Sequence, residues 1–325
     1  MKIAICIAGM SRNYDKCYQS MLDYFTIDGI EFDFFIHTWT NVGYKRHCPD
    51  KGVEYNHHKD SLKEDLINIY KPKKITVEDQ FECKEIKQSL KTIKNLSSFY
   101  PHVKIPKRCK TDLDNYDETS DTFSALTFLG FQFGHFCSIE KASKLRREYE
   151  QENNFRYDLV FRFRSDFLIP PKNDEQRKRT YDGFKQMCEE RGNTKCGGDS
   201  IWTHWISICG QNSGPHVADH VFGGGSAAFD IFNDLLQHAT RRMIRHSQGD
   251  LNHWCTTGEG VIGDLIMEKG VYARAHGPLM EIGQEIYRDY HREAEDQSIH
   301  NIKRLRMERE HKPRRLREDS ASWNH

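Results

Sequence analysis

Arg164, Ser165 and Asp166 directly follow a run of alternating apolar residues, and their side chains suit the binding of charged groups. Residues 157–163 have the pattern of a buried β-strand. Ligands of open α/β sheets lie at the carboxyl ends of strands, where a carboxylate beside an arginine can hold a metal ion and an anion together. The pattern therefore indicates a site for a metal-bridged diphosphate. The alternative is an Arg–Asp ion pair that only caps the strand.

A second candidate anion site follows the first predicted strand, residues 2–7. Ala8 and Gly9 lead to Arg12, and a helix is predicted to begin near Tyr14. Glycine permits close approach of a ligand to the backbone, a helix start offers free N–H groups, and arginine adds a fixed positive charge. These features suit a nucleotide phosphate, although they do not form the G-x-G-x-x-G fingerprint. The alternative is a tight turn at Gly9 with Arg12 facing water.

Histidines stand at two further predicted strand ends. His37 lies near the end of strand 32–39, where it could contact a nucleobase or ribose, or be hydrogen-bonded into the fold. His276 follows strand 271–275 and could reach a metal ion held by Asp166.

Two carboxylates are candidates for the activation of an acceptor hydroxyl. Asp219 precedes three glycines at 223–225, which we expect to allow close approach of a substrate before the predicted helix 227–239. Glu259 stands before the predicted helix 261–269, at an end that faces the cleft. The alternatives are a structural carboxylate at 219 and, at 259, a side chain that only favours the helix electrostatically.

The elements that must position these residues alternate between strands and helices. Further strands are predicted at 73–77 and 201–208, and further helices at 61–70 and from Thr119 to about residue 152. This order predicts an α/β fold with an open, mainly parallel twisted sheet flanked by helices. We expect one catalytic domain over residues 1–290, with a charged insertion or loop at about 80–118 and a charged insertion at about 170–198 that leaves the core. A charged tail is expected at 291–325.

Composition limits the possible partners. The 325 residues include 48 basic and 48 acidic side chains, so no net charge favours binding to nucleic acid.

The ten cysteines form no C-x-x-C pair, and no apolar run has the length of a secretory signal or a membrane span. These features predict reduced thiols and a cytoplasmic protein without a transmembrane segment.

The order of these motifs resembles that of GT-A-type glycosyltransferases, in particular the bacterial and large-virus polysaccharide enzymes. The resemblance covers about residues 1–80 and 119–285. It depends on residues 8–12, 33–39, 157–166 and 219–223, and on Glu259 with its helix.

The resemblance implies a GT-A, Rossmann-like fold and transfer of a sugar from a nucleotide-diphosphate sugar to a glycan hydroxyl. It implies that Asp166 binds Mn²⁺ or Mg²⁺, with Arg164 standing where the family's Asp-x-Asp motif has its first Asp. A viral chain would act in the host cytoplasm. Two other classes stay open: a sugar-nucleotide-forming nucleotidyltransferase and a non-catalytic carbohydrate-binding protein. The donor, the acceptor, the stereochemistry and the oligomeric state are not specified by the sequence.

Overall fold

The computed structural model describes residues 1–40, 59–80, 82–93, 121–190, 200–203, 206–208, 215–249, 256–275, 279 and 285–286. These residues all belong to one compact unit, Met1–Tyr287. The predicted tail at 291–325 and most of the predicted insertion at 80–118 lie outside the described residues.

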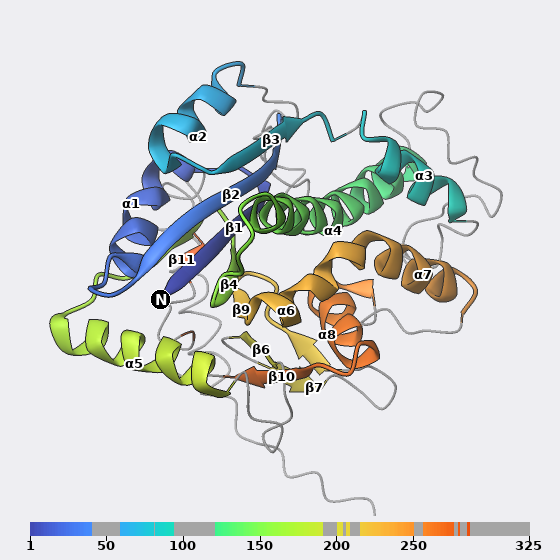
Figure 1. The fold of residues 1–325 in the computed structure, drawn as a ribbon. Helices are drawn as coiled ribbons and strands as arrows, with labels where there is room; N and C mark the ends of the chain where they lie inside the picture. The colour runs from blue at the N-terminus through green and yellow to red at the C-terminus, as the bar shows by residue number, and fades with distance from the viewer. Residues whose placement is uncertain are drawn as a thin grey trace, which may run out of the picture. The chain divides into compact units, whose positions relative to one another are not determined.

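A seven-stranded sheet forms the centre of this unit (Figure 1). Its strands are β1 (Lys2–Met10), β2 (Glu31–Trp39), β3 (Lys74–Glu78), β4 (Leu159–Phe163), β6 (Ser200–Thr203), β9 (Phe222–Gly224) and β10 (Tyr272–Ala275). The spatial order is β10-β6-β9-β4-β1-β2-β3, and β9 runs antiparallel to both of its neighbours. The other neighbouring pairs are parallel. The predicted mainly parallel α/β sheet is confirmed, and the architecture is compatible with a Rossmann-like fold.

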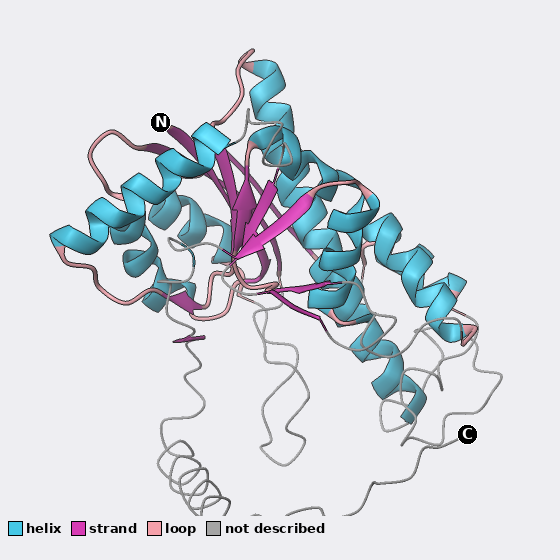
Figure 2. Cartoon of the chain, turned by 90° about the horizontal axis from the view of Figure 1, so that it is seen from below, coloured by secondary structure: helices cyan, strands magenta, loops and turns pink. Residues whose placement is uncertain are grey.

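Helices cover both faces of the sheet, as Figure 2 shows. One face packs against α1 (Tyr14–Phe25), α2 (Leu62–Tyr70) and α5 (Asp174–Glu190). The other face packs against α3 (Lys84–Thr92), α4 (Asp121–Glu152), α6 (Ser226–Phe229), α7 (Leu235–Ser247) and α8 (Gly258–Glu268). The sheet therefore separates two apolar cores.

The side chains of β1 explain how the long helix α4 lies close to the sheet. Ile3, Ile5 and Ile7 point into the core with α1 and α2, because alternate residues of a strand face opposite sides. The residues between them, Ala4, Cys6 and Ala8, face α4 and are all small. Small side chains on this face leave room for the helix backbone, and the Cys6 Sγ lies 3.7 Å from the Ala142 carbonyl oxygen.

Two predicted element boundaries were wrong. The predicted strand 201–208 is two strands, because β6 belongs to the central sheet whereas β7 (Ile206–Ile208) pairs with β8 (Pro215–Val217). Gly9, expected in a turn after the first strand, lies within β1. The remaining two-stranded pair is formed by β5 (Phe167–Leu168), which directly follows Asp166, and β11 (Glu285–Ile286), which runs antiparallel to it.

The two hydrophilic stretches are packed more closely than their sequences predict. Within 170–198, α5 buries Phe184 and Met187 against the sheet, and the Phe184 ring stacks on Phe25. Within 80–118, α3 buries Ile86 and Leu90 against the core with α4. Helices of this kind show few apolar residues in sequence because only one narrow side of each is covered. Within the described residues, both stretches therefore contribute a helix that packs on the core, and their description as insertions stays a prediction.

Candidate functional site

The carboxyl ends of β1 and β4 meet where the order of strands reverses. The chain moves outward from β1 to β2 and β3, and then returns to place β4 on the opposite side of β1. In open α/β sheets, such a reversal leaves a crevice at the carboxyl ends, where ligands bind. Arg12 follows β1, and Arg164 and Asp166 follow β4, so the topology brings the predicted donor-site residues to this point.

Two guanidinium groups enclose the Asp166 carboxylate. Arg164 donates to both carboxylate oxygens, from Nε and from a terminal nitrogen, each at 2.8 Å. Arg12 places a terminal nitrogen 3.4 Å from Asp166 Oδ2. The side chains of Arg12, Arg164 and Asp166 are 9%, 14% and 1% exposed, so all three are largely shielded from solvent. We call Arg12, Arg164 and Asp166 the carboxyl-edge cluster.

Electrostatics keeps the Arg164 guanidinium charged. Burial alone would lower the pKa of Arg164, but the Asp166 carboxylate outweighs burial and raises that pKa above its ordinary value. Asp219 and Glu259 act in the same direction, so four charged groups of the predicted site influence one another.

Two hydrogen bonds fix the loops that carry the cluster. The Ser165 hydroxyl donates to the Met10 carbonyl oxygen at 3.1 Å and thereby joins the ends of β4 and β1. The Ser11 hydroxyl donates to Thr38 Oγ1 at 2.8 Å and joins the ends of β1 and β2. Ser165 is only 2% exposed, so we assign it a supporting role and not direct contact with a ligand.

Arg162, which the sequence interpretation did not select, ties three parts of the site together. Its side chain is 1% exposed and donates to the carbonyl oxygens of Asp219, His220 and Ala8. Burial lowers the pKa of this guanidinium. Ala8, predicted to approach a ligand, is itself buried and holds Arg162 through its backbone. Arg162 thus positions the segment that carries Asp219.

Asp219 is held by two histidines. Its Oδ1 lies 2.7 Å from His220 Nδ1, and its Oδ2 lies 3.3 Å from His135 Nε2 on α4. Burial would raise the pKa of Asp219, but the bonds to His135 and His220 reverse the effect and hold it well below its ordinary value. A carboxylate with a low pKa is a weak general base. This geometry favours an orienting role for Asp219.

Glu259 has a more open setting in the first turn of α8. The helix begins after Thr257, whose hydroxyl oxygen accepts a hydrogen bond from the Gly260 N–H at 3.1 Å. Glu259 is half-buried, and within the described part of the chain its carboxylate makes no hydrogen bond or ion pair. Its charge nevertheless acts on Arg164 and on His216. Glu259 is therefore the better placed of the two carboxylates to accept a proton.

The glycines at 223 and 224 have a structural role. A Cβ atom on Gly223 would lie 2.1 Å from the Phe161 ring and 2.5 Å from the Val160 carbonyl oxygen. A Cβ on Gly224 would lie 2.4 Å from the Ser200 carbonyl oxygen. These glycines allow β9 to fit between β4 and β6, so the expectation that they admit a substrate was wrong at these two positions.

Gly9 and His37 meet at the Ser138 hydroxyl of α4. The Gly9 N–H donates to Ser138 Oγ at 2.6 Å, and His37 Nδ1 lies 2.9 Å from the same oxygen. The other ring nitrogen of His37 lies 2.7 Å from Glu78 Oε1, and the ring is fully buried. This arrangement favours the structural alternative for His37 over contact with a nucleobase. Gly9 has a φ of 114°, which a residue with a side chain rarely adopts.

The described residues do not fit a metal ion at Asp166. Both of its carboxylate oxygens already accept hydrogen bonds from Arg164, and a cation there would face two guanidinium charges. His276, the second predicted ligand, lies outside the described residues.

One group of three candidate ligands occurs elsewhere among the described residues: His238, Asp264 and Glu268. The two carboxylates approach different ring nitrogens, at 3.1 and 3.2 Å. Arg242 and Arg241 also pair with them, at 2.7 and 3.1 Å. This group is better explained as an ion-pair network between α7 and α8.

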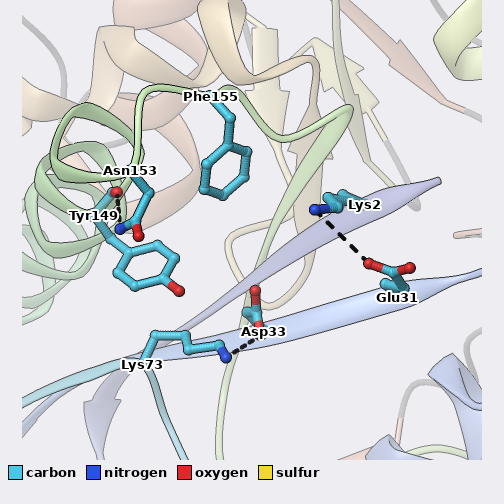
Figure 3. Close-up of a pocket in the computed structure, with 7 residues that line it drawn as sticks. All are labelled: Lys2, Glu31, Asp33, Lys73, Tyr149, Asn153 and Phe155. Atoms are coloured by element: carbon cyan, nitrogen blue, oxygen red, sulfur yellow. Dashed lines mark hydrogen bonds and ion pairs between the residues drawn. The ribbon is translucent and has the colours of Figure 1, made fainter.

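The opposite edge of the sheet has an open pocket of about 360 Å³. Figure 3 shows the residues that line it: Lys2, Glu31, Asp33, Lys73, Tyr149, Asn153 and Phe155. Both lysines point toward carboxylates, with Lys2 and Glu31 at 3.9 Å and Lys73 and Asp33 at 3.4 Å. Because the pocket lies at the amino ends of β1 and β2, it is separate from the carboxyl-edge cluster.

Neither a model of a known protein family nor a curated protein matches this sequence. None of the helices in the described part of the chain combines the length and apolar character needed to cross a membrane.

Proposed function

We propose that the chain transfers a sugar from a nucleotide-diphosphate sugar to a hydroxyl group of a glycan. The observation that carries the proposal is the carboxyl-edge cluster at the point where the strand order reverses. Two arginines at one such crevice suit a diphosphate, because guanidinium groups bind phosphate oxygens with two parallel hydrogen bonds.

The donor reaction requires positive charge where the leaving group develops. Cleavage of the anomeric C–O bond releases a nucleoside diphosphate, and its growing negative charge is stabilised by preorganised donors. Arg12 and Arg164 supply such donors, and Asp166 fixes the orientation of both side chains. Helix α1 begins two residues after Arg12, at Tyr14, and the positive end of its dipole adds to the positive field.

The acceptor hydroxyl loses a proton during transfer. In a reaction that inverts configuration, Glu259 is the proposed general base, because its carboxylate is half-buried and is not engaged by a described partner. Asp219, held by His135 and His220, is proposed to orient the acceptor or these histidines. In a reaction that retains configuration, both carboxylates serve to orient.

The diphosphate is neutralised here by arginine side chains instead of a metal ion. A divalent cation is implied by the resemblance to GT-A enzymes, but arginine takes the position of the first acidic residue of their motif. Direct contact between arginine and phosphate provides the same neutralisation.

A non-catalytic carbohydrate-binding protein is the second candidate. The ion pairs that enclose Asp166 favour this alternative, because a cluster with a purely structural role would also hold its carboxylate fully paired.

One assay separates the candidate classes. The full chain is incubated with a panel of sugar nucleotides and glycan acceptors, with Mn²⁺ and with a chelator in parallel, and the products are separated by chromatography. We expect acceptor-dependent release of nucleoside diphosphate in both conditions. Formation of pyrophosphate from a sugar phosphate and a nucleoside triphosphate would instead identify a nucleotidyltransferase. Binding of glycan without any turnover would identify the carbohydrate-binding alternative and overturn the proposal.

A further inference from the structure

Two cysteines meet between α3 and α4, away from the carboxyl-edge cluster. Cys83 immediately precedes α3, and Cys137 lies within α4. Their Sγ atoms are 3.8 Å apart. Both are free thiols, with exposed fractions of 4% and 1%. A disulfide requires a separation of about 2 Å, so a small change in side-chain rotamers joins them.

The surroundings of Cys83 favour its thiolate. The Lys141 ammonium group lies 3.7 Å from Cys83 Sγ, and the thiol stands at the positive end of α3. The hydrogen bond from Cys137 is the main cause that lowers the pKa of Cys83, and Lys141 acts in the same direction. Burial opposes them by raising the pKa, as does the Glu85 carboxylate, which accepts from the Cys83 thiol at 3.2 Å.

The other described buried cysteines differ. Burial raises the pKa of both Cys6 and Cys17 to about 12. Such thiols remain protonated and react slowly with oxidants. They provide internal controls for the reactivity of Cys83.

We propose that Cys83 and Cys137 form a reversible dithiol–disulfide site that reacts with a peroxide. The Cys83 thiolate attacks hydrogen peroxide, so that an S–O bond forms, the O–O bond breaks and hydroxide leaves, to be protonated to water. The Cys137 sulfur then attacks the Cys83 sulfenic acid, an S–S bond forms, and water leaves with the Cys137 proton. Two thiols and one peroxide thus give one disulfide and two water molecules. A dithiol reductant reverses the change.

The disulfide would tie α3 to α4 covalently. Lys141 also pairs with Glu78, which contacts His37, and His37 contacts Ser138. Ser138 accepts the hydrogen bond from Gly9, so this series of contacts leads from the two cysteines toward the end of β1. The site depends only on these contacts and stands whether or not the chain transfers sugars.

The test uses the reduced full chain. The protein is treated with one equivalent of hydrogen peroxide, its remaining thiols are alkylated, and the peptides are mapped by mass spectrometry. We expect a peptide pair linked through Cys83 and Cys137, its loss after treatment with dithiothreitol, and alkylated Cys6 and Cys17. Recovery of Cys83 and Cys137 as alkylated thiols, or of Cys83 as a sulfinic acid without the linked pair, would overturn the proposal.

Four variants separate the roles of the residues. Cys137→Ser should leave Cys83 as a sulfenic acid that dimedone traps, whereas Cys83→Ser should leave Cys137 as a thiol. Lys141 is a positioning residue, so Lys141→Gln should slow formation of the disulfide by roughly an order of magnitude, and Lys141→Arg should restore the rate. Equal rates in wild type and Lys141→Gln would contradict the role of the lysine.

Discussion

Arg12 is the residue whose proposed role is easiest to separate from stability. It approaches one oxygen of Asp166 at 3.4 Å, whereas Arg164 makes a bidentate contact with that carboxylate. We expect Arg12→Ala to weaken binding of a nucleoside diphosphate by about 1.5–3 kcal/mol, the contribution of a hydrogen bond to a charged group. Isothermal titration calorimetry measures this change. Lys63→Ala, on the exposed side of α2, is the matched control and should bind normally. An unchanged dissociation constant in Arg12→Ala would assign Arg12 to the fold alone.

Glu259 and Asp219 differ in how their carboxylates are held, so we expect their substitution to have different effects. Glu259→Gln should slow sugar transfer by about 100-fold or more, the usual contribution of a general base, while donor affinity stays unchanged. Asp219→Asn should slow transfer and also reduce stability, because it disrupts the contacts with His135 and His220. Steady-state kinetics beside donor calorimetry would check both. Normal transfer in both variants would place the acceptor site elsewhere.

Asp219 also predicts a dependence of stability on pH. Its pKa is held below the ordinary value of 3.8 by the bonds to His135 and His220, despite burial. A depressed pKa stabilises the folded protein fully above the unfolded value, and this contribution is lost as pH falls through the folded value. The difference in unfolding free energy between wild type and Asp219→Asn should therefore shrink below about pH 4. Urea unfolding between pH 3 and pH 7 measures it, and a constant difference would show that Asp219 has an ordinary pKa.

At the scale of elements, β9 fits between β4 and β6 only because it carries glycine. Gly223→Ala would push a methyl group against Phe161 and the Val160 backbone, and overpacking of this kind costs about 1–3 kcal/mol. Gly130 on α4 is the control, because nothing lies within 4 Å of its added Cβ. Gly130→Ala should be neutral or stabilising by up to about 1 kcal/mol, since alanine favours helix. Thermal denaturation of the two variants checks the prediction, which fails if both behave alike.

Elements rich in apolar residues could be predicted from sequence, and elements with few apolar residues could not. The apolar strand β1 and the long helix α4 were both predicted, although β1 continues to Met10, beyond its predicted end. Helix α5 contains 17 residues with few apolar side chains, and its contact with the sheet depends on Phe184 and Met187. No local pattern reveals that two such residues meet a core formed by distant strands.

At the scale of the whole molecule, Glu150 joins α4, the start of β4 and α6. Its carboxylate lies 2.7 Å from Arg146, accepts from the Tyr157 N–H at 2.9 Å and from the Ser226 hydroxyl at 2.6 Å, and is fully buried. Glu150→Gln should destabilise the fold by about 1–3 kcal/mol, because it removes one of the two carboxylates that pair with the buried Arg146, the other being Asp230. Glu148→Gln, whose side chain is 56% exposed, is the control and should cost about 1 kcal/mol or less. Equal midpoints of urea unfolding would contradict this account of the network.

The carboxyl-edge cluster could be predicted from sequence because its residues follow strands whose ends must meet in a parallel sheet. Arg12 and Asp166 are 154 positions apart, yet each stands just after a recognisable strand. His135 and Arg162 were missed, because one lies within a long helix and the other within a strand, where apolar packing is the simpler interpretation. A buried arginine in an otherwise apolar strand was the available signal, since such a charge requires partners. The pairing of Asp219 with two histidines depends on the three-dimensional fold.

The central claim is that two arginines at the carboxyl edge hold a nucleoside diphosphate. Calorimetric titration of wild type and Arg164→Ala with a panel of nucleoside diphosphates, in chelator and again in Mn²⁺, tests this claim most directly. We predict that wild type binds at least one of them in chelator, and that Arg164→Ala loses roughly tenfold or more in affinity. Absence of binding to wild type in both conditions, or equal affinity in the variant, would contradict the account.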